Sequence, residues 1–361
     1  MLACKTITIP AGRRARILVV DDSVVIRRLV TTALEQVADF EVVGTAANGK
    51  IALGKIEQLD PDVITLDIEM PEMDGLQTLK ALRAKHCRAK VIMFSTLTER
   101  GGQATLEALA LGADDYATKA SNVGSLDKSM STLKDELVPK IRHLLHWQTS
   151  VRPPSSAALP MRPVVVPRSP RALARRALVI GISTGGPAAL SEIVPLFPAS
   201  FSAPVLIVQH MPPMFTRLLA ERLQTKASLE VREAQENDAV VPGRILIAPG
   251  DRHLRVKSVG GKIVAALDQG PPENSCRPAA DVLFRSAAEV WGGAVVAAIL
   301  TGMGQDGLKG IKALSDLGAY VVAQDEASSV VWGMPGAVVG AGLAHSVVSL
   351  GKIVEEIRKQ F

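Results

Sequence analysis

Short apolar runs alternate with amphipathic segments in the first part of the chain. Five apolar runs have the length of strands: Arg16–Val20, Val42–Ala46, Val63–Asp67, Val91–Ser95 and Tyr116–Thr118. Four segments between them place apolar residues at helical spacing: Val24–Gln36, Lys50–Gln58, Leu76–Ala84 and Gln103–Leu111. Because strand-like and helix-like segments alternate, the pattern predicts an α/β fold, a (βα)5 domain on a doubly wound parallel sheet.

The last part of the chain repeats this alternation. Strands are predicted at Ala177–Ile180, Val205–Val208, Ile245–Ala248, Ala294–Leu300 and Tyr320–Ala323. Helices are predicted at Ala188–Leu196, Thr216–Lys226, Ala280–Val290 and Leu308–Leu314. Two further runs, Leu254–Ser258 and Ile263–Leu267, are separated by Val259-Gly260-Gly261 and predict a hairpin. We therefore expect a second doubly wound, mostly parallel α/β domain with a β-hairpin insertion.

Proline and arginine concentrate between the two halves. Residues 147–176 carry six arginines, no acidic residue and six prolines. Repeated proline fixes φ and removes N–H donors, which favours an extended, poorly packed segment. We therefore predict a domain over residues 15–140, a Pro/Arg-rich linker over 141–176 and a domain over 177–361.

The net charge of +5 comes from that linker. Residues 1–140 hold 18 Lys and Arg against 19 Asp and Glu, and residues 177–361 hold 16 against 17. A nucleic-acid-binding domain would need a basic face of its own, so we expect no nucleic-acid partner.

No apolar run approaches the ~20 residues of a membrane span, and the three cysteines lack metal-ligand spacing. We expect a cytoplasmic protein without membrane insertion.

Polar residues follow all but one of the predicted N-terminal strands. They are Asp21 and Asp22 after the first, Asp67 at the end of the third, Ser95 at the end of the fourth and Lys119 after the fifth. Parallel strands bring these positions to one edge, where three carboxylates repel one another unless a hard cation such as Mg²⁺ joins them. A hydroxyl and an ammonium opposite the metal would hold phosphoryl oxygens. Solvated strand ends would explain the paired aspartates alone, but not all five residues.

These residues resemble the receiver domain of two-component response regulators. The resemblance extends to Thr65-Leu66-Asp67-Ile68-Glu69-Met70-Pro71, Met73-Asp74-Gly75 and Thr118-Lys119. It implies that Asp67 accepts phosphate from a histidine kinase and that Mg²⁺ binds Asp21, Asp22, Asp67 and the Glu69 backbone carbonyl. It also implies phosphoryl contacts from Ser95 and Lys119, and a side chain at Tyr116 that responds to phosphorylation. Ala120 departs from the family's proline, so the bond before it is either trans or strained, because a cis form costs ~2.5–4 kcal/mol.

Three residues with the chemistry of nucleophilic catalysis follow strands in the C-terminal half. Ser183 lies in Gly181-Ile182-Ser183-Thr184-Gly185, a strand-to-helix turn that exposes a serine oxygen near backbone N–H groups. His210 and Asp306 follow two other strands, and a serine nucleophile needs such a base and orienting acid. Alone, a helix-capping aspartate, a surface histidine or a glycine turn explains each piece. Together at one sheet edge they predict a hydrolytic Ser–His–Asp site.

Two other enzyme classes fit this pattern less well. A dinucleotide-binding fingerprint would place glycine at Ser183 and an acid near Gln209 or His210. The order Ser…His…Asp also differs from the Ser…Asp…His order of α/β-hydrolases.

The C-terminal motifs resemble the chemotaxis protein-glutamate methylesterase family, CheB. They are Gly181–Gly186, Gln209-His210-Met211-Pro212-Pro213, Ile247–His253, Arg277-Pro278, Asp281–Phe284, Thr301–Gly307 and Gly333-Met334-Pro335. The resemblance implies that Ser183 is the nucleophile, His210 the base and Asp306 its orienting partner, with no cofactor at the esterase site. It implies that Thr184 and Met303 line the reaction centre and offer oxyanion N–H groups. Cys276 stands where the family often has histidine.

The two resemblances together imply phosphorylation-activated demethylation of glutamate methyl esters on methyl-accepting chemoreceptors, with deamidation of receptor glutamines, in chemotactic adaptation. In that family the unphosphorylated receiver covers the catalytic cleft, and phosphate on Asp67 shifts the population toward an open form. A transcriptional regulator would need a helix-turn-helix or basic output domain, which the C-terminal half lacks. A catalytically idle receptor-binding adaptor would not need Ser183, His210 and Asp306.

Overall fold

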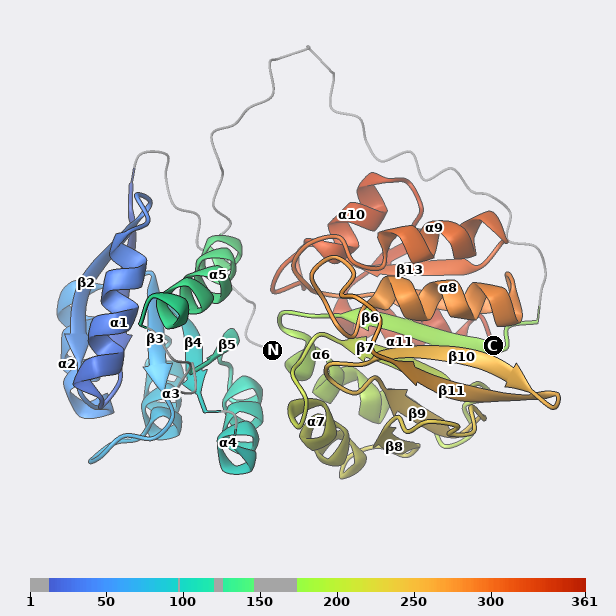
Figure 1. Ribbon diagram of the computed structural model, residues 1–361, viewed down its shortest axis with the longest axis horizontal. Helices are drawn as coiled ribbons and strands as arrows, with labels where there is room; N and C mark the ends of the chain where they lie inside the picture. Colours follow the sequence, from blue (N-terminus) through green and yellow to red (C-terminus); the bar gives the residue numbers. More distant parts are fainter. Residues whose placement is uncertain (1–12, 97, 120–125, 146–173) are drawn as a thin grey trace, which may run out of the picture. The chain divides into compact units, whose positions relative to one another are not determined.

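The computed structural model describes residues 13–96, 98–119, 126–145 and 174–361. The chain divides into two compact units, Met1–Ser156 and Ala157–Phe361, and each is described by itself (Figure 1). Ala120 and most of the predicted linker lie outside the described residues, so the bond before Ala120 and the linker's conformation stay predictions.

The N-terminal unit is built on five parallel strands in the order β2-β1-β3-β4-β5. They are β1 (Ala15–Val20), β2 (Phe40–Ala46), β3 (Val63–Asp67), β4 (Lys90–Ser95) and β5 (Asp115–Thr118). The helices are α1 (Val24–Glu35), α2 (Gly49–Leu59), α3 (Gly75–Ala84), α4 (Glu99–Ala110) and α5 (Leu126–Leu144). Helix α1 packs against α5, while α3 contacts both α2 and α4. The predicted (βα)5 fold is confirmed.

Helix α5 continues past the predicted domain boundary at residue 140. Ile141 and Leu144 within it, and Leu145 beyond it, are fully buried. The predicted linker therefore begins later than residue 141, because these apolar side chains complete the helix that covers this sheet.

Four helices of the N-terminal unit begin at a polar cap directly after a strand or its loop. Side-chain oxygens of Ser23, Asn48, Asp74 and Thr98 accept backbone N–H groups at the starts of α1, α2, α3 and α4. Asp74 and Gln77 form a reciprocal capping box. Because of these caps, each helix begins within a short loop after the preceding strand, so the helix N-terminus lies close to the carboxyl end of that strand.

The C-terminal unit has a seven-stranded sheet in the order β14-β13-β12-β6-β7-β9-β8. Its strands are β6 (Ala177–Ile182), β7 (Val205–Gln209), β8 (Glu230–Glu233), β9 (Arg244–Ile247), β12 (Val295–Ile299), β13 (Tyr320–Gln324) and β14 (Ser346–Val348). The predicted hairpin is present as β10 (His253–Val259) paired with β11 (Lys262–Asp268). All pairs within the large sheet are parallel. The predicted second α/β domain is confirmed.

The described part of this unit has six α-helices, and the last of them follows the final strand, β14. They are α6 (Gly186–Ile193), α7 (Phe215–Gln224), α8 (Ala280–Trp291), α9 (Leu308–Asp316), α10 (Met334–Gly340) and α11 (Leu350–Arg358). Sequence patterns missed β8 and β14 because these edge strands bury few side chains and alternate polar with apolar residues only briefly.

The strand order of the large sheet reverses at its central strand, β6. This strand pairs with the next strand along the chain, β7, on one side and with the much later strand β12 on the other. Every residue of these three strands is buried, as expected for the middle of a parallel sheet covered on both faces. A change of winding direction leaves a crevice at the carboxyl ends of such strands.

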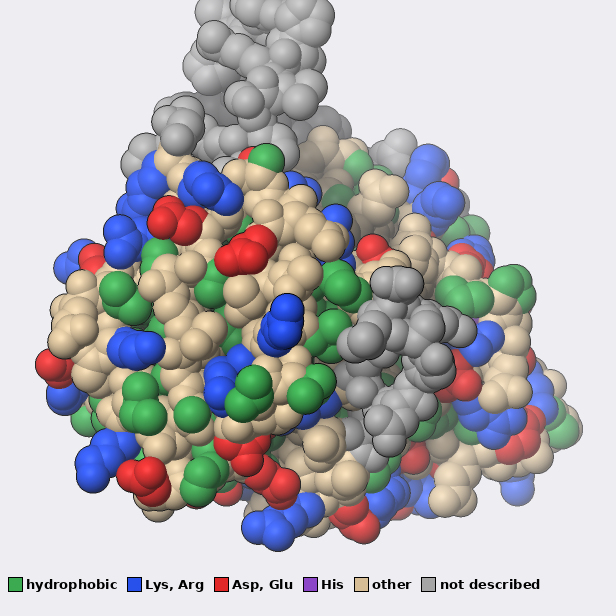
Figure 2. Space-filling model, turned by 60° about the vertical axis from the view of Figure 1, so that its left-hand side comes forward, with side chains coloured by type: hydrophobic (Ala, Val, Ile, Leu, Met, Phe, Trp, Pro, Cys, Tyr) green, Lys and Arg blue, Asp and Glu red, His purple; other side chains and the backbone are tan. Residues whose placement is uncertain are grey.

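Charged side chains on the face drawn in Figure 2 are interspersed. Lys and Arg lie beside Asp and Glu on that face, without a continuous patch of one sign among the residues described there. In the part of the chain that the structure describes, no helix is long and apolar enough to cross a membrane.

Burial in β12 predicts a measurable contribution to stability. Val296 in this strand is 0% exposed, whereas Val259 at the hairpin tip is 52% exposed. We expect Val296→Ala to lower the free energy of unfolding of the C-terminal unit by about 2 kcal/mol, because it leaves a cavity in a packed sheet. Denaturant unfolding followed by the fluorescence of Trp291 and Trp332 measures this loss. The matched control, Val259→Ala, should change it by less than about 0.5 kcal/mol, and equal effects would contradict the burial argument.

Candidate catalytic and phosphoacceptor sites

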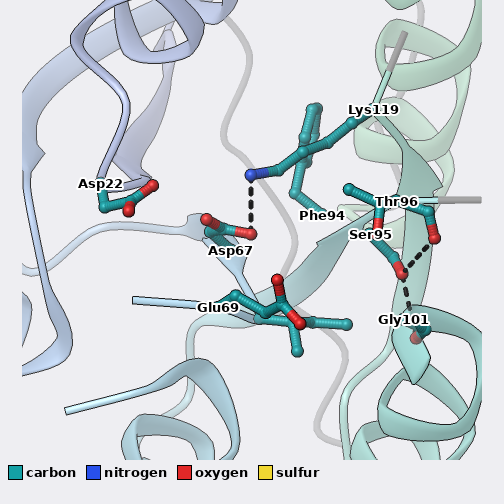
Figure 3. Close-up of a pocket in the computed structure, with 9 residues that line it drawn as sticks. Asp22, Asp67, Glu69, Phe94, Ser95, Thr96, Gly101 and Lys119 are labelled. Atoms are coloured by element: carbon teal, nitrogen blue, oxygen red, sulfur yellow. Dashed lines mark hydrogen bonds and ion pairs between the residues drawn. The ribbon is translucent and has the colours of Figure 1, made fainter. Parts of the chain in front are cut away.

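A pocket of about 170 Å³ opens at the carboxyl ends of β3, β4 and β5. Figure 3 shows the acidic side chains on one side and Ser95 and Thr96 on the other. The side chains and backbone that line it come from Asp22, Asp67, Ile68, Glu69, Phe94, Ser95, Thr96, Gly101 and Lys119. Four of these, Ile68, Phe94, Thr96 and Gly101, were not predicted as site residues.

Lys119 links two of the predicted carboxylates. Its Nζ lies 2.8 Å from Asp21 Oδ2 and 2.8 Å from Asp67 Oδ1. Burial raises the pKa of Asp67 to about 6, and the Asp21 charge adds to this, while the Lys119 ammonium opposes it. The ammonium thus offsets part of the cost of holding Asp67 ionised next to another carboxylate.

The acidic cluster fits a divalent cation. Oxygens of Asp21, Asp22 and Asp67 lie within 4.8 Å of one another. Among the described residues Asp67 Oδ2 is buried without a hydrogen-bond partner, an arrangement that costs free energy unless a cation or donor meets it. Carboxylate oxygens are the ligands that Mg²⁺ prefers, so these residues suit it. The Glu69 side chain lies 3.4 Å from Arg100, and the role of its backbone carbonyl stays a prediction.

Ser95, a predicted phosphoryl contact, and Tyr116, the side chain predicted to respond to phosphorylation, are both buried. Ser95 Oγ is within hydrogen-bond distance of the backbone carbonyls of Gly101 (3.0 Å) and Thr96 (3.2 Å), and so donates away from Asp67 (Figure 3). The Tyr116 side chain is 7% exposed, with the Lys140 ammonium 4.8 Å from its ring centre. A phosphoryl group on Asp67 would have to draw the Ser95 hydroxyl away from these carbonyls.

Ser183 lies in a tight turn between β6 and α6. Gly185 has a φ of 78°, a left-handed conformation that glycine adopts without strain, and Pro187 occupies the first helical turn. A side chain at Gly302 would lie 2.8 Å from Ser183 Cβ, so only glycine lets the loop after β12 approach this turn. The Ser183 N–H donates to the Thr301 carbonyl at 2.9 Å. The serine is thereby held at the strand end next to that loop.

His210 and Asp306 are in direct contact. His210 Nε2 lies 2.8 Å from Asp306 Oδ2, and His210 Nδ1 lies 3.6 Å from Cys276 Sγ. Among the described residues, Ser183 Oγ makes no hydrogen bond to His210. The structure thus brings the predicted base and acid together and places the predicted nucleophile at the neighbouring strand end. Because Nε2 faces the carboxylate, Nδ1 is the nitrogen left to take up a proton.

Asp306 is ionised despite being 2% exposed. Burial opposes its charge, but the hydrogen bond to His210 and the N–H groups of Ala280 (2.6 Å) and Asp281 (3.2 Å) outweigh burial and lower its pKa. These two amides begin helix α8, whose positive dipole end favours an anion. For His210, burial lowers the pKa, but the bonds to Asp306 and Cys276 prevail and raise it to about 10.

Side chains next to Ser183 hydrogen-bond to backbone carbonyls of its turn. Thr184 and Met303 are half-buried, and the Thr301 hydroxyl donates to the Thr184 carbonyl at 2.9 Å; their oxyanion roles stay predictions. Gln209, which was not predicted as a site residue, donates through Nε2 to the carbonyls of Ser183 (3.0 Å) and His210 (3.2 Å). The sequence feature that could have predicted a role for Gln209 is its position directly before His210.

The contact between His210 and Asp306 predicts a change in proton affinity. In Asp306→Asn we expect the His210 pKa to fall from about 10 to its ordinary value or below, because the carboxylate is lost while burial remains. A histidine-selective NMR titration of the full chain measures this midpoint. Asp316→Asn, which alters an exposed aspartate paired with Lys312, is the matched control and should leave it unmoved. An unchanged midpoint in Asp306→Asn would show that the pair does not set the charge of His210.

Known proteins resemble this chain over both units. Residues 178–357 match the CheB methylesterase family, and residues 17–131 match the response regulator receiver domain. A protein-glutamate methylesterase/protein-glutamine glutaminase of Nocardioides sp. is 50% identical over 348 residues, covering 96% of this chain and 95% of the relative. One with the same description from Trichodesmium erythraeum is 48% identical over 346 residues, covering 95% and 97%.

A solved structure supports the same assignment. The crystal structure of the Thermotoga maritima CheB methylesterase catalytic domain is 43% identical, with a TM-score of 0.51, and the match covers 52% of this chain and all of that one. The parallel sheet, the serine turn and the near full-length relatives agree: the chain belongs to the CheB methylesterase family, with a response regulator receiver domain at its N-terminus.

Proposed function

We propose that this chain is a phosphorylation-activated protein-glutamate methylesterase and protein-glutamine glutaminase. It removes methyl esters from glutamates of methyl-accepting chemoreceptors and deamidates receptor glutamines, which gives adaptation in chemotaxis. One observation carries the proposal: the His210–Asp306 pair, 2.8 Å apart, lies at strand ends that flank the turn holding Ser183.

The ester is cleaved in two acyl-transfer steps. In molecules whose His210 is neutral, Ser183 Oγ attacks the side-chain carbonyl carbon and passes its proton to His210 Nδ1, while Nε2–H remains bonded to Asp306. The tetrahedral intermediate collapses, and the leaving methoxide takes the proton and departs as methanol. Water, deprotonated by the same nitrogen, then releases glutamate from Ser183. A glutamine substrate follows this route with ammonia as the leaving group.

Backbone donors stabilise the oxyanion that forms in both steps. The N–H groups of Thr184 and Met303 are the proposed donors, because Thr184 follows the nucleophile and the tight approach of Gly302 brings the next residue beside it. A donor of this kind typically contributes ~10²–10³-fold to kcat.

The receiver unit supplies the control. Asp67 accepts phosphate from a histidine kinase, with Asp21, Asp22, Asp67 and the Glu69 carbonyl holding Mg²⁺ and with Ser95 and Lys119 contacting phosphoryl oxygens. The ion, when bound, offsets the negative charge gathered at the acceptor. Tyr116 responds to the redirected Ser95 hydroxyl. The proposal places the chain in the cytoplasm, with the kinase.

Loss of the nucleophile tests the catalytic assignment. We expect Ser183→Ala to lower methanol release from methylated receptors by several orders of magnitude, since the nucleophile of a triad has no substitute. Ser202→Ala, at an exposed serine before β7, should retain wild-type turnover. Labelling of the wild type, but not of Ser183→Ala, by a serine-reactive phosphonate separates the enzyme from an idle adaptor. Turnover that persists in Ser183→Ala would disprove the assignment.

Loss of the phosphate acceptor tests the control. In Asp67→Asn we expect a small phosphodonor to leave the rate of methanol release unchanged, because the amide cannot form the acyl phosphate. The same ratio in Asp60→Asn should equal that of the wild type; Asp60 is exposed and has a φ of 40°, which asparagine tolerates. Stimulation that survives in Asp67→Asn would place the acceptor elsewhere.

A further inference from the structure

The turn Glu273–Cys276 reaches the His210–Asp306 pair from outside the three predicted residues. Glu273 N donates to the Cys276 carbonyl at 3.0 Å, and Cys276 N donates to the Glu273 carbonyl at 2.8 Å. The two residues between them, Asn274 and Ser275, have φ of 50° and 63°. Asparagine is one of the residues that adopt this left-handed conformation at little cost, so Asn274 fits its position in the turn.

The Asn274 amide donates to two buried carboxylates. Its Nδ2 lies 2.9 Å from Asp306 Oδ1 and 3.0 Å from Asp281 Oδ2, which uses both hydrogens of the NH₂ group. Asp281 and Asp306 are 1% and 2% exposed. Each carboxylate also accepts from the start of a helix, Asp306 from α8 and Asp281 from the Gly310 N–H of α9 at 2.7 Å.

The segment that carries this turn is firmly held. His253, 1% exposed, contacts its two ends: the Pro271 carbonyl lies 3.1 Å from Nε2, and the Ala279 N–H donates to Nδ1 at 3.2 Å. Glu273 also pairs with Arg285 of α8 at 2.5 Å. Asn274 is therefore presented to the carboxylates from a fixed backbone.

We propose that Asn274 is a positioning residue, whose two amide hydrogens hold the Asp306 carboxylate against His210 and separate it from Asp281. The inference rests on the proposed function, because Asn274 acts only through the proposed acid and base. Two adjacent buried carboxylates repel each other. Burial and the Asp306 charge raise the pKa of Asp281, while hydrogen bonds from Gly310 and Asn274 oppose this rise.

The charged and titratable groups around the pair come from four elements. They are Asp281 and Arg285 of α8, Asp306 before α9, Glu273 and Cys276 of the turn, and His210 after β7. Within this set Asn274 is a neutral donor to both carboxylates. Its loss leaves Asp306 more basic, so the imidazolium form of His210 is favoured and the unprotonated base becomes scarcer at a given pH.

A pair of glycine variants tests this role in the full chain. In Asn274→Gly the backbone accepts the turn but both donors are lost, so we expect kcat for methanol release to fall roughly tenfold with KM unchanged. We also expect the acidic limb of the pH profile of kcat/KM to move upward by on the order of one unit. Ser275→Gly, in the same turn at an exposed residue, should keep wild-type kcat and the wild-type limb.

The outcomes separate this inference from the proposed function. An Asn274→Gly variant with wild-type kcat and an unmoved limb, or an equal loss in Ser275→Gly, would overturn the positioning role. If Asn274→Gly does not fold, Asn274→Asp keeps the turn and adds negative charge, and its limb should also move upward; an unmoved limb there would overturn it too. A wild type that releases no methanol, or a fully active Ser183→Ala, would instead overturn the proposed function.

Discussion

The catalytic unit depends on one buried carboxylate, Asp306. Burial alone would favour its neutral form, yet four donors meet its two oxygens: His210, Asn274 and the first amides of α8. These donors come from the end of β7, from the turn before α8 and from α8 itself. The same carboxylate therefore sets the charge of the imidazole and ties the end of β7 to the segment that begins α8, two parts of the chain that are distant in the sequence.

The two acidic sites of this chain differ in how their charges are balanced. Asp67 has one oxygen paired with Lys119, and the other is buried with no hydrogen-bond partner in the part of the chain that the structure describes, which leaves it available to a cation or a phosphoryl group. Asp306 has both oxygens satisfied and its pKa held low. The proposed phosphate acceptor needs an oxygen that stays available, whereas the proposed orienting acid needs a fixed position, and the surrounding donors differ accordingly.

Both units place their chemistry at the edge where parallel strands end. The strand order reverses at β1 in one sheet and at β6 in the other, and the polar residues follow those strands and their neighbours. The strands themselves bury nearly all of their residues, so side chains at their carboxyl ends are the first that reach solvent. The same topological rule thus accounts for the positions of the proposed phosphate acceptor and the proposed nucleophile, each within its own unit.

The sequence by itself determined the fold class of both units and the strand ends at which polar chemistry would gather, because apolar periodicity and parallel winding are local properties repeated along the chain. It did not reveal the short edge strands β8 and β14, the helices α5, α10 and α11, or the parts played by Gln209 and Asn274. Only the tertiary structure decided that His210 presents Nε2 to Asp306 and Nδ1 to Cys276, and that Asn274 bridges two carboxylates. These contacts join residues up to 96 positions apart, and they depend on side-chain packing and donor geometry that no single segment encodes.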